Sequence, residues 1–330
     1  MKITIIGSGS WATALANVFA YNNHEVLIVA RDQASFDNEK HINIKYFPNK
    51  ILSENITFTT SLKDSLNKCD AILLCVPSKV FRLKLTEINQ YLNHKVIFLN
   101  ATKGLDENTF TPLSNVIKEI IPNEKRSMLV SLLGPSFASE VIENKLTAIS
   151  AVSSSIDDAK YIQQQFSTPY FRIYSNDDEI GSQVSAALKN VIAIASGIIY
   201  GLGEGENAKA ALVTRGLQEI IRYGQFFNCK TSTFYGLTGI GDLLLTCSSV
   251  KSRNFYIGTL IGQNNSAKEV LANNTLTVEG VATCKYAKLL ADKNNIYAPV
   301  INGLYSVLFL DEKPSVVIEK IMLNSLKSEN

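Results

Sequence analysis

Short runs of almost wholly apolar residues recur through the first half of the chain, and stretches with a helical period of apolar and polar residues separate several of them. Such runs, rich in Ile, Val and Leu, are typical of strands that are buried on both faces of a sheet. The predicted strands are residues 3–6, 25–30, 71–76, 96–100, 128–133, 148–152 and 171–174, and the predicted helices between them include 11–21, 80–91 and 111–121. This alternation predicts an α/β fold with a Rossmann-like, doubly wound and mostly parallel sheet.

The pattern changes after about residue 176, where β-branched runs become rare. Helices are predicted at residues 180–200, 207–227, 242–248, 254–262, 279–293 and 299–310. A chain of 330 residues also has the length of two ordinary domains. We therefore expect a sheet domain at residues 1–178 and an all-helical domain at residues 179–330.

Composition and charge argue against several classes of protein. Hydrophobic residues make up 46% and charged residues 19% of the chain, as in a globular protein with a sizeable core. The net charge of +2 is too small to predict nucleic acid or a membrane surface as the main partner. No apolar run reaches the roughly 18 residues of a membrane-spanning helix, so no membrane insertion is expected. Five scattered cysteines indicate reduced thiols in a reducing compartment.

Residues 7–12 have the sequence GSGSWA, follow the first predicted strand and open a helix. This is the G-x-G-x-x-G/A pattern of a dinucleotide-binding βαβ unit, in the position that the pattern requires. Gly7 would allow the tight turn, Gly9 would let a pyrophosphate approach the backbone, and Ala12 would still permit close helix packing. The helix N-terminus would then offer N–H groups to the phosphates. A tight turn without a ligand is the alternative, and Trp11 either walls the pyrophosphate or packs the helix.

The end of the second predicted strand bears on the choice of cofactor. An acid at this place holds the ribose 2′-hydroxyl of NADH, whereas an arginine accommodates the 2′-phosphate of NADPH. Arg31 comes first and favours NADPH, while the neighbouring Asp32 leaves NADH open. A solvated surface charge is the alternative for Arg31.

The proton donor for carbonyl chemistry is predicted to be a lysine. The three histidines, His24, His41 and His94, all lie in the first third of the chain, and no cluster with metal-ligand spacing is present. A histidine-dependent hydroxyacid dehydrogenase and a zinc-dependent alcohol dehydrogenase are therefore disfavoured, and no metal is expected. Lys189 lies in an apolar helical stretch, where burial lowers the pKa of an ammonium and suits it to protonate a carbonyl oxygen. A lysine whose stem extends to the surface is the alternative.

Two further segments place polar groups at helix starts in the second domain. Asp242 ends a glycine-punctuated segment, where it either caps a helix or provides the counter-charge that orients Lys189, and the two roles can coexist. Ser252, Arg253 and Asn254 come shortly before another helix. The arginine fork, the smaller donors and the helix N-terminus fit an anion such as a phosphate. An ordinary helix start is the alternative.

Polar and small residues also follow three strands of the first domain. These segments are residues 76–78, 100–104 and 134–138. Ligands of parallel sheets bind outside the carboxyl ends of the strands, so we expect these segments at the cofactor and substrate site. Lys103 would meet a phosphate or the substrate, and Gly134, Ser136 and Ala138 would pass close to the substrate and the nicotinamide. Each segment alone is also a plausible turn.

Taken together, these segments resemble the NAD(P)-dependent glycerol-3-phosphate dehydrogenases of the bacterial type. The resemblance runs from residue 3 to about residue 310, nearly the whole chain. Its motifs, in order, are GSGSW at 7–11, VPS at 76–78, ATKGL at 101–105, GPSFA at 134–138, KNVIA at 189–193, GIGDL at 239–243, SRN at 252–254 and VEG at 278–280. One such match would be chance, but eight in one order are specific.

The resemblance implies reduction of dihydroxyacetone phosphate, a small phosphorylated ketone, to sn-glycerol 3-phosphate for glycerophospholipid synthesis, with NADPH or NADH as cofactor and Lys189 as proton donor and acceptor beside Asp242. The implied substrate-binding residues are Lys103, Gly134, Ser136, Lys189, Asp242, Ser252, Arg253 and Asn254. The implied cofactor-binding residues are Ser10, Trp11, Arg31, Lys103, Ala138, Arg253, Thr277 and Glu279, which add to Gly7 and Gly9 of the predicted dinucleotide turn. Such enzymes are usually cytoplasmic and often homodimeric, which is expected here too.

The sequence departs from the family pattern at Ala12 and Thr277, where relatives often have Gly and Val, and Glu279 is also an ordinary acid for the first turn of a helix. Two other functions stay open. A β-hydroxyacid or 6-phosphogluconate-type dehydrogenase also uses a lysine on a buried helix, but its helix typically carries an Asn several residues later, whereas Asn190 is adjacent to Lys189. A non-catalytic NAD(P)H-sensing protein would need neither a buried lysine nor a second anion site.

Overall fold

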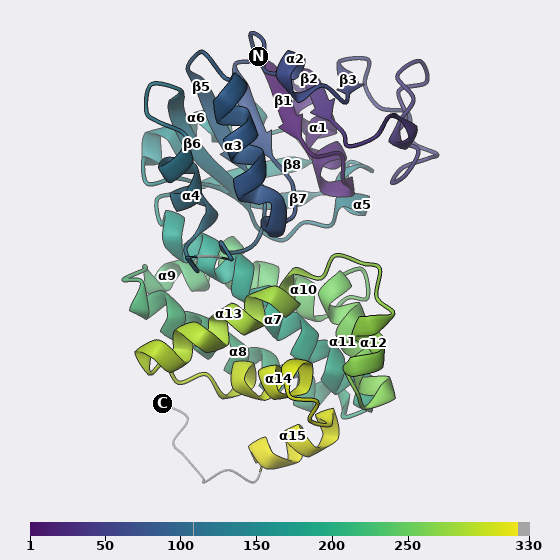
Figure 1. The fold of residues 1–330 in the computed structure, drawn as a ribbon, viewed down its shortest axis with the longest axis vertical. Helices are drawn as coiled ribbons and strands as arrows, with labels where there is room; N and C mark the ends of the chain where they lie inside the picture. The colour runs from purple at the N-terminus through teal and green to yellow at the C-terminus, as the bar shows by residue number, and fades with distance from the viewer. Residues whose placement is uncertain (108, 323–330) are drawn as a thin grey trace. The chain divides into compact units, whose positions relative to one another are not determined.

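The computed structural model describes residues 1–107 and 109–322, and the chain divides into two compact units, Met1–Gln183 and Val184–Asn330 (Figure 1). The first unit holds the described strands, and the second is helical. Helix α7 (Glu179–Leu202) begins in the first unit and continues into the second.

An eight-stranded sheet forms the centre of the first unit. Its strands are β1 (Lys2–Ile6), β2 (Glu25–Val29), β3 (Ile56–Thr59), β4 (Ala71–Leu74), β5 (Val96–Asn100), β6 (Arg126–Leu133), β7 (Thr147–Val152) and β8 (Phe171–Asn176). They are arranged in the order β3-β2-β1-β4-β5-β6-β7-β8, and neighbours are parallel except for the antiparallel pair β6 and β7. This confirms the expected Rossmann-like sheet followed by a helical region.

Among the described strands, only β3 was not predicted by the apolar pattern. Ile56 and Phe58 are buried, whereas Thr57 is exposed and Thr59 is half-buried. The strand lies at the edge of the sheet, so its sequence alternates between apolar and polar residues instead of forming an apolar run.

Alternate strand positions feed two separate cores, one on each face of the sheet. On β4, Leu73 enters the first core, whereas Ile72 and Leu74 enter the second. The first core includes α1 (Ser10–Tyr21), α5 (Ala138–Val141) and α6 (Ile156–Phe166), and the second includes α2 (Leu62–Ser65), α3 (Phe81–Tyr91) and α4 (Leu113–Ile120). Short 3₁₀ turns lie at Gln33–Ser35 and Ser78–Val80. Because β1 to β6 are parallel, the segments that follow them lie along one edge of the sheet.

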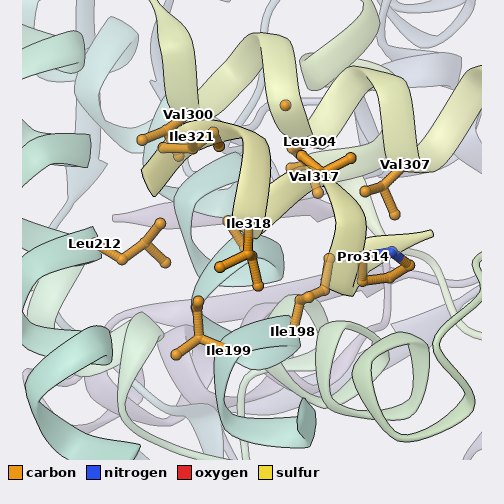
Figure 2. A pocket seen from close by; sticks show the side chains of 12 residues that line it. Ile198, Ile199, Leu212, Val300, Leu304, Val307, Pro314, Val317, Ile318 and Ile321 are labelled. Carbon is orange, nitrogen blue, oxygen red and sulfur yellow. The ribbon is translucent and has the colours of Figure 1, made fainter. Parts of the chain in front are cut away.

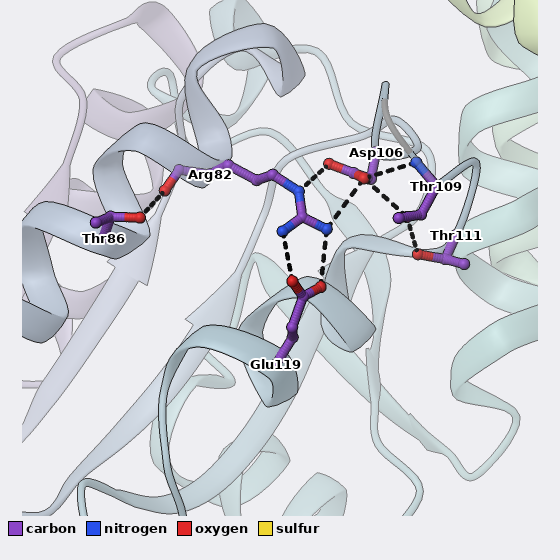
Figure 3. A network of polar contacts seen from close by, with 6 residues as sticks. All are labelled: Arg82, Thr86, Asp106, Thr109, Thr111 and Glu119. Carbon is purple, nitrogen blue, oxygen red and sulfur yellow. Dashed lines mark hydrogen bonds and ion pairs between the residues drawn. The ribbon is translucent and has the colours of Figure 1, made fainter.

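An ion cluster anchors the segment that follows β5. The Arg82 guanidinium on α3 lies between two carboxylates, donating to Asp106 at 2.8 and 3.2 Å and to Glu119 on α4 in two bonds of 2.8 Å (Figure 3). Thr109 adds a backbone and a hydroxyl bond to Asp106, at 2.9 and 2.7 Å. Burial would raise the pKa of Asp106, but the bonds from Arg82 and Thr109 outweigh it and hold the pKa below its ordinary value. The cluster ties the segment that carries Lys103 to α3 and α4.

Helices α7 to α15 build the second unit. After α7 they are α8 (Gly205–Phe226), α9 (Thr231–Phe234), α10 (Asp242–Cys247), α11 (Arg253–Asn264), α12 (Lys268–Ala272), α13 (Glu279–Asn294), α14 (Pro299–Phe309) and α15 (Pro314–Met322), with a π-helical turn at Leu237–Gly241. The six predicted helices correspond to α7, α8, α10, α11, α13 and α14. Helices α9 and α12 have four and five residues, too few for a periodic pattern. Helix α15 was also not predicted. It begins at Pro314, and a proline at the first position of a helix is a sequence feature that could have indicated it.

No apolar stretch was expected to be long enough for a membrane span, but α7 is longer and more apolar than that expectation allowed. The helix has 24 residues, and its most apolar part has a mean hydropathy of 1.5, which by length and composition suffices to cross a membrane. However, 89% of that part is buried inside the protein. A helix that is apolar on nearly every face and enclosed in this way is a core helix.

A small cavity of about 40 Å³ lies among α7, α8, α14 and α15. Figure 2 shows apolar side chains around it, among them Ile198 of α7, Leu212 of α8, Leu304 of α14 and Val317 of α15. An apolar lining of this kind offers a water molecule few hydrogen-bond partners. The apolar face of α15 thus closes the core at this point.

A buried glutamate caps α14. Glu219 on α8 is 1% exposed and accepts hydrogen bonds from the N–H groups of Val300 at 2.6 Å and Ile301 at 3.0 Å, both in the first turn of α14. Burial raises the pKa of Glu219 to about 7, although the two backbone bonds act in the opposite direction. The carboxylate therefore links two helices and satisfies N–H groups that have no partner within α14.

The raised pKa of Glu219 should make stability depend on pH near neutrality. Because the folded protein holds this proton more tightly than the unfolded chain, the group contributes stability at low pH that is lost as the pH rises from about 4.5 to about 7. In thermal unfolding between about pH 5 and about pH 7, Glu219→Gln should show a smaller fall in melting temperature than the parent. Glu119→Gln is the control, because the bond from Arg82 lowers the pKa of Glu119 out of this range. Equal falls in the parent and Glu219→Gln would contradict the prediction.

Candidate active site

The turn between β1 and α1 has the backbone that its glycines were expected to allow. Gly7 has φ +112°, and a Cβ there would lie 2.4 Å from the carbonyl oxygen of Cys75, so only glycine fits. Gly9 has φ −68° and ψ 172° and precedes the first residue of α1, Ser10. A Cβ at Gly9 would meet nothing within 4 Å, so the backbone borders open space there.

The groups around this turn fit an anionic dinucleotide. Helix α1 has no acidic residue in its first turn and no side-chain cap at its N-terminus, so neither competes with a phosphate for its N–H groups. The indole Nε1 of Trp11 is buried and has no hydrogen-bond partner among the described residues. The Trp11 ring lies 6.5 Å from that of Phe171, so the side chain also packs on the core. Both interpretations of Trp11 therefore have a basis in the structure.

The two charged residues after β2 differ in their contacts. Asp32 accepts a hydrogen bond from the Ser35 hydroxyl at 2.7 Å, within the 3₁₀ turn that follows. Arg31 is exposed and makes no hydrogen bond or ion pair to any residue that the structure describes. The guanidinium is thus available to a ligand, whereas the carboxylate is engaged locally.

Three predicted substrate residues meet at the ends of β5 and β6. The carbonyl oxygen of Gly134 accepts bonds from Lys103 Nζ and Ser136 Oγ, both at 3.0 Å. Gly134 has φ +142°, and a Cβ there would approach the Ile149 Cα to 3.0 Å. Ala138 follows closely as the half-buried first residue of α5. The structure therefore brings an ammonium and a hydroxyl to one point of the strand-end edge.

Lys189 is buried on α7 and held by two side chains of α10. It is 4% exposed, and its Nζ donates to Asp242 Oδ1 at 2.7 Å and to Thr246 Oγ1 at 2.8 Å. Asp242 itself is 1% exposed. A buried ammonium of this kind requires both the counter-charge and the hydrogen bonds, because an unpaired one costs several kcal/mol.

The position of Asp242 depends on an irregular turn before α10. Residues Leu237–Gly241 form a π-helical turn in which Gly239 has φ −96° and ψ −111°. A Cβ at Gly239 would lie 2.1 Å from the carbonyl oxygen of Phe234, so no other residue fits. This close approach starts α10 at Asp242 and directs its first turn toward Lys189.

The segment predicted to hold a phosphate starts α11. Ser252 is its N-cap, with Oγ accepting from the N–H of Phe255 at 3.3 Å. Arg253 is exposed and has no partner in the described part of the chain, and the first turn of α11 contains no acid. A guanidinium at a helix N-terminus without competing carboxylates suits an anion.

Asn254 joins this segment to the helix of Lys189. Its Nδ2 donates to Asn190 Oδ1 at 3.0 Å, and its Oδ1 accepts from the N–H of Gly280 at 3.0 Å. A Cβ at Gly280 would lie 2.5 Å from the carbonyl oxygen of Asn190. Gly280 follows Glu279, the first residue of α13, so that predicted cofactor residue lies near this junction, whereas Thr277 is exposed in the preceding loop.

Two residues of this arrangement were missed in the sequence. Thr246 lies one helical turn after Asp242, and its hydroxyl also bonds the Asp242 carbonyl oxygen at 2.6 Å; the i, i+4 spacing was the signal for it. Asn190, next to Lys189, was noted only as a family marker. In residues 1–107 and 109–322, no group of three or more His, Cys, Asp or Glu side chains could hold a metal ion.

Helices α7 and α11 pack through glycines. Cβ atoms added at Gly197 and Gly201 of α7 would lie 2.1 Å from the Phe255 carbonyl oxygen and 2.2 Å from that of Thr259. On α11, a Cβ at Gly258 would lie 2.1 Å from the carbonyl oxygen of Ile194. The two backbones are therefore in contact, which fixes the N-terminus of α11 relative to α7.

Comparison with known protein families gives matches to both halves of the chain. Residues 2–159 match the model described as NAD-dependent glycerol-3-phosphate dehydrogenase N-terminus, and residues 178–319 match that described as its C-terminus. A curated relative named glycerol-3-phosphate dehydrogenase (NAD(P)+), from Enterococcus faecalis, is 46% identical over 100% of this chain and 97% of its own. One of the same name from Streptococcus uberis is 42% identical, with 100% and 98% covered.

Solved structures agree in fold. A glycerol-3-phosphate dehydrogenase from Coxiella burnetii has a TM-score of 0.91 and 33% identity, covering 98% of this chain and 99% of its own. Another from Saccharomyces cerevisiae has a TM-score of 0.83 and 26% identity, with 97% and 99% covered.

Substituting a glycine of the α7–α11 contact should displace Asn254 from Asn190. In Gly258→Ala the helices must separate, because the new methyl group would overlap a backbone carbonyl, and overpacking of this kind costs roughly 1–3 kcal/mol. We expect a lower melting temperature and a large loss of turnover. Gly236→Ala is the control, since its nearest neighbour would be an ordinary 3.4 Å away. Normal turnover in Gly258→Ala would mean that the spacing of α7 and α11 does not matter for activity.

Proposed function

The chain belongs to the NAD-dependent glycerol-3-phosphate dehydrogenase family, and from this we propose that it reduces dihydroxyacetone phosphate to sn-glycerol 3-phosphate with Lys189 as proton donor. The family consists of NAD(P)-dependent oxidoreductases that act on CH–OH groups, with NADH or NADPH as cofactor. The bound cofactor supplies the hydride. The residues of this chain hold the substrate and move the proton.

The observation that carries the proposal is the buried ammonium of Lys189 between Asp242 and Thr246. Two bonds, of 2.7 Å to Asp242 and 2.8 Å to Thr246, fix the position of Nζ inside the protein. As the C2 carbonyl of the substrate becomes an alkoxide, Lys189 gives a proton to its oxygen. The Asp242 carboxylate orients the lysine, and in the reverse reaction the neutral lysine takes the proton back.

The substrate phosphate is proposed to bind at the N-terminus of α11. Arg253 supplies a bidentate fork and Ser252 a hydroxyl, beside helix N–H groups that no acid neutralises. Asn254 is held by Asn190 and Gly280, so its remaining amide proton has a fixed direction. Lys103, Gly134 and Ser136, which meet at one carbonyl oxygen, are proposed as further substrate contacts.

The cofactor is proposed to lie on the turn from Gly7 to Trp11 and over Ala138. We expect a preference for NADPH, because Arg31 is available to a 2′-phosphate while Asp32 is bonded to Ser35. Arg253, Thr277 and Glu279 are proposed as further cofactor contacts on the family resemblance.

We also propose that the protein is a cytoplasmic homodimer. None of the five cysteines forms a disulfide among the described residues, and burial raises the pKa of Cys69 to about 11 and that of Cys247 to about 12, as suits inert reduced cysteines. The dimer follows the family resemblance, and light scattering on the purified protein measures it.

Family membership decides among the functions that the sequence left open. The matches cover both halves of the chain, including the helical half that carries Lys189, and they favour glycerol-3-phosphate dehydrogenase over a β-hydroxyacid or 6-phosphogluconate-type enzyme. A non-catalytic sensor has no use for the buried lysine pair.

The direct test is cofactor oxidation by the purified protein. We expect rapid oxidation of NADPH, and slower oxidation of NADH, with dihydroxyacetone phosphate. Pyruvate and unphosphorylated dihydroxyacetone should give little oxidation of either cofactor, because neither fills the phosphate site. In Arg253→Gln, the KM for the phosphorylated ketone should rise with a smaller change in kcat. Cofactor binding without turnover on any of these carbonyl compounds would contradict the proposed function.

The role of Lys189 is tested by removing the ion pair as a whole. Lys189→Met alone would leave the buried Asp242 carboxylate without its ammonium counter-charge, so the double variant Lys189→Met/Asp242→Asn is the better test protein. We expect kcat to fall by roughly 10²–10⁴-fold, the usual contribution of a general acid. The Kd of NADPH, measured by fluorescence, should stay near that of the parent. Comparable losses of cofactor binding and turnover would instead indicate that the lysine only supports the fold.

A further inference from the structure

A buried asparagine from a distant loop reaches the dinucleotide turn. Asn43 lies in the connection between β2 and β3 and is 0% exposed. Its Nδ2 donates to the carbonyl oxygen of Ser8 at 3.1 Å and to Thr13 Oγ1 at 2.8 Å. Thr13 in turn donates through its hydroxyl to the carbonyl oxygen of Gly9 at 3.1 Å. The amide thus holds the Ser8 carbonyl directly, whereas the Gly9 carbonyl also accepts the first helical bond of α1, from the Thr13 N–H at 3.0 Å.

The loop around Asn43 is built so that this amide is oriented. Asn43 Oδ1 accepts from the N–H of Tyr46 at 3.2 Å, and its backbone carbonyl accepts from the N–H of Phe47 at 2.8 Å. The preceding Ile42 is bridged to both Asp37 and Ile51. Oδ1 of Asn43 is therefore bonded within its own loop, and Nδ2 is directed at the dinucleotide turn.

The direction of the Ser8 carbonyl decides what the turn offers to a ligand. In a trans peptide the C=O and the following N–H point to opposite sides. With the Ser8 carbonyl held by Asn43, the N–H of Gly9 is turned away from Asn43. With the Gly9 carbonyl held by Thr13, the N–H of Ser10 is turned away from Thr13. A carbonyl oxygen facing a phosphate would repel it, so fixing these two carbonyls favours an anion on the other side.

We infer that Asn43 is a positioning residue for the cofactor: by holding the Ser8 carbonyl it fixes the Ser8–Gly9 peptide plane, so that the Gly9 N–H rather than the Ser8 carbonyl faces the pyrophosphate. The inference rests on the proposed place of the cofactor at this turn. Asn43 touches the turn and not the ligand, so it acts on cofactor affinity and leaves the proton transfer at Lys189 unchanged.

The loop offers a matched control in Asn38. Its Nδ2 donates to the carbonyl oxygen of Phe58 at 3.0 Å, and its Oδ1 accepts from the N–H of Phe58 at 2.9 Å. Asn38 therefore makes the same kind of bonds from the same loop, but to strand β3 instead of the dinucleotide turn. Asn38→Ala weakens the attachment of the loop without releasing Ser8.

The experiment measures the Kd of NADPH by fluorescence titration and the melting temperature without ligand, for the parent, Asn43→Ala and Asn38→Ala. We expect Asn43→Ala to raise the Kd roughly tenfold, as the loss of one or two hydrogen bonds would. Its kcat at saturating cofactor should stay within about twofold of the parent. Asn38→Ala should keep the parent Kd even where its melting temperature falls. Asn43→Leu, which has a similar volume, loses the donors and adds no charge beside the phosphates, gives the same answer if Asn43→Ala is too unstable.

Two results would overturn the inference. One is a parent-like Kd in both Asn43 variants, and the other is an equal rise in Asn43→Ala and Asn38→Ala, which would make loop attachment the cause. Gly9→Val separates this from a failure of the proposed cofactor site, because its side chain would fill the open space at the turn. If Gly9→Val binds NADPH normally, the cofactor lies elsewhere and both proposals fall. If only Gly9→Val loses binding, the site stands and the role of Asn43 falls.

Discussion

The burial of the Lys189 ammonium constrains how the helices of the second unit are arranged. An ammonium inside an apolar helix needs a counter-charge and hydrogen bonds, and the residues of its own helix cannot supply the counter-charge. It comes from Asp242, 53 residues away along the chain, together with the hydroxyl of Thr246. Asp242 reaches this place through a turn that tolerates only glycine at position 239. The charge on one helix thereby fixes the start of another.

The packing of α7 against α11 through glycines also fixes the position of the anion-binding segment at the start of α11. Helix α7 carries Lys189 and Asn190 near its middle and Gly197 and Gly201 further along, so one rigid helix presents both the proton donor and the packing face for α11. Because the backbones touch, the start of α11 cannot slide, and the Asn190–Asn254 hydrogen bond forms at its end. Chemistry and packing are thus set by residues about two helical turns apart.

Much of this could be predicted from the sequence, for reasons that differ between elements. Buried strands such as β5 give continuous apolar runs, whereas the edge strand β3 gives an alternating tetrapeptide that resembles many loops. Lys189 stood out because a charge in an apolar helix is conspicuous. Asn43 did not, because it is one polar residue in a long polar loop, and its significance comes only from tertiary folding that brings it to Ser8. Thr246 was missed for a different reason, because its i, i+4 spacing from Asp242 on one helix was a local signal that was not used.

The glycines of the α7–α11 contact cannot be replaced one at a time without moving the helices apart. Each of the four glycines there, Gly197, Gly201, Gly258 and Gly262, faces a backbone carbonyl, which cannot be exchanged for a smaller neighbour. Gly216 is different, because a Cβ there would meet the side chain of Ile192, which a compensating change to a smaller residue can shorten. Evolutionary divergence of this helical unit should therefore proceed through side-chain contacts such as that of Gly216 with Ile192, while the four glycines of the α7–α11 contact stay unchanged as new specificities arise.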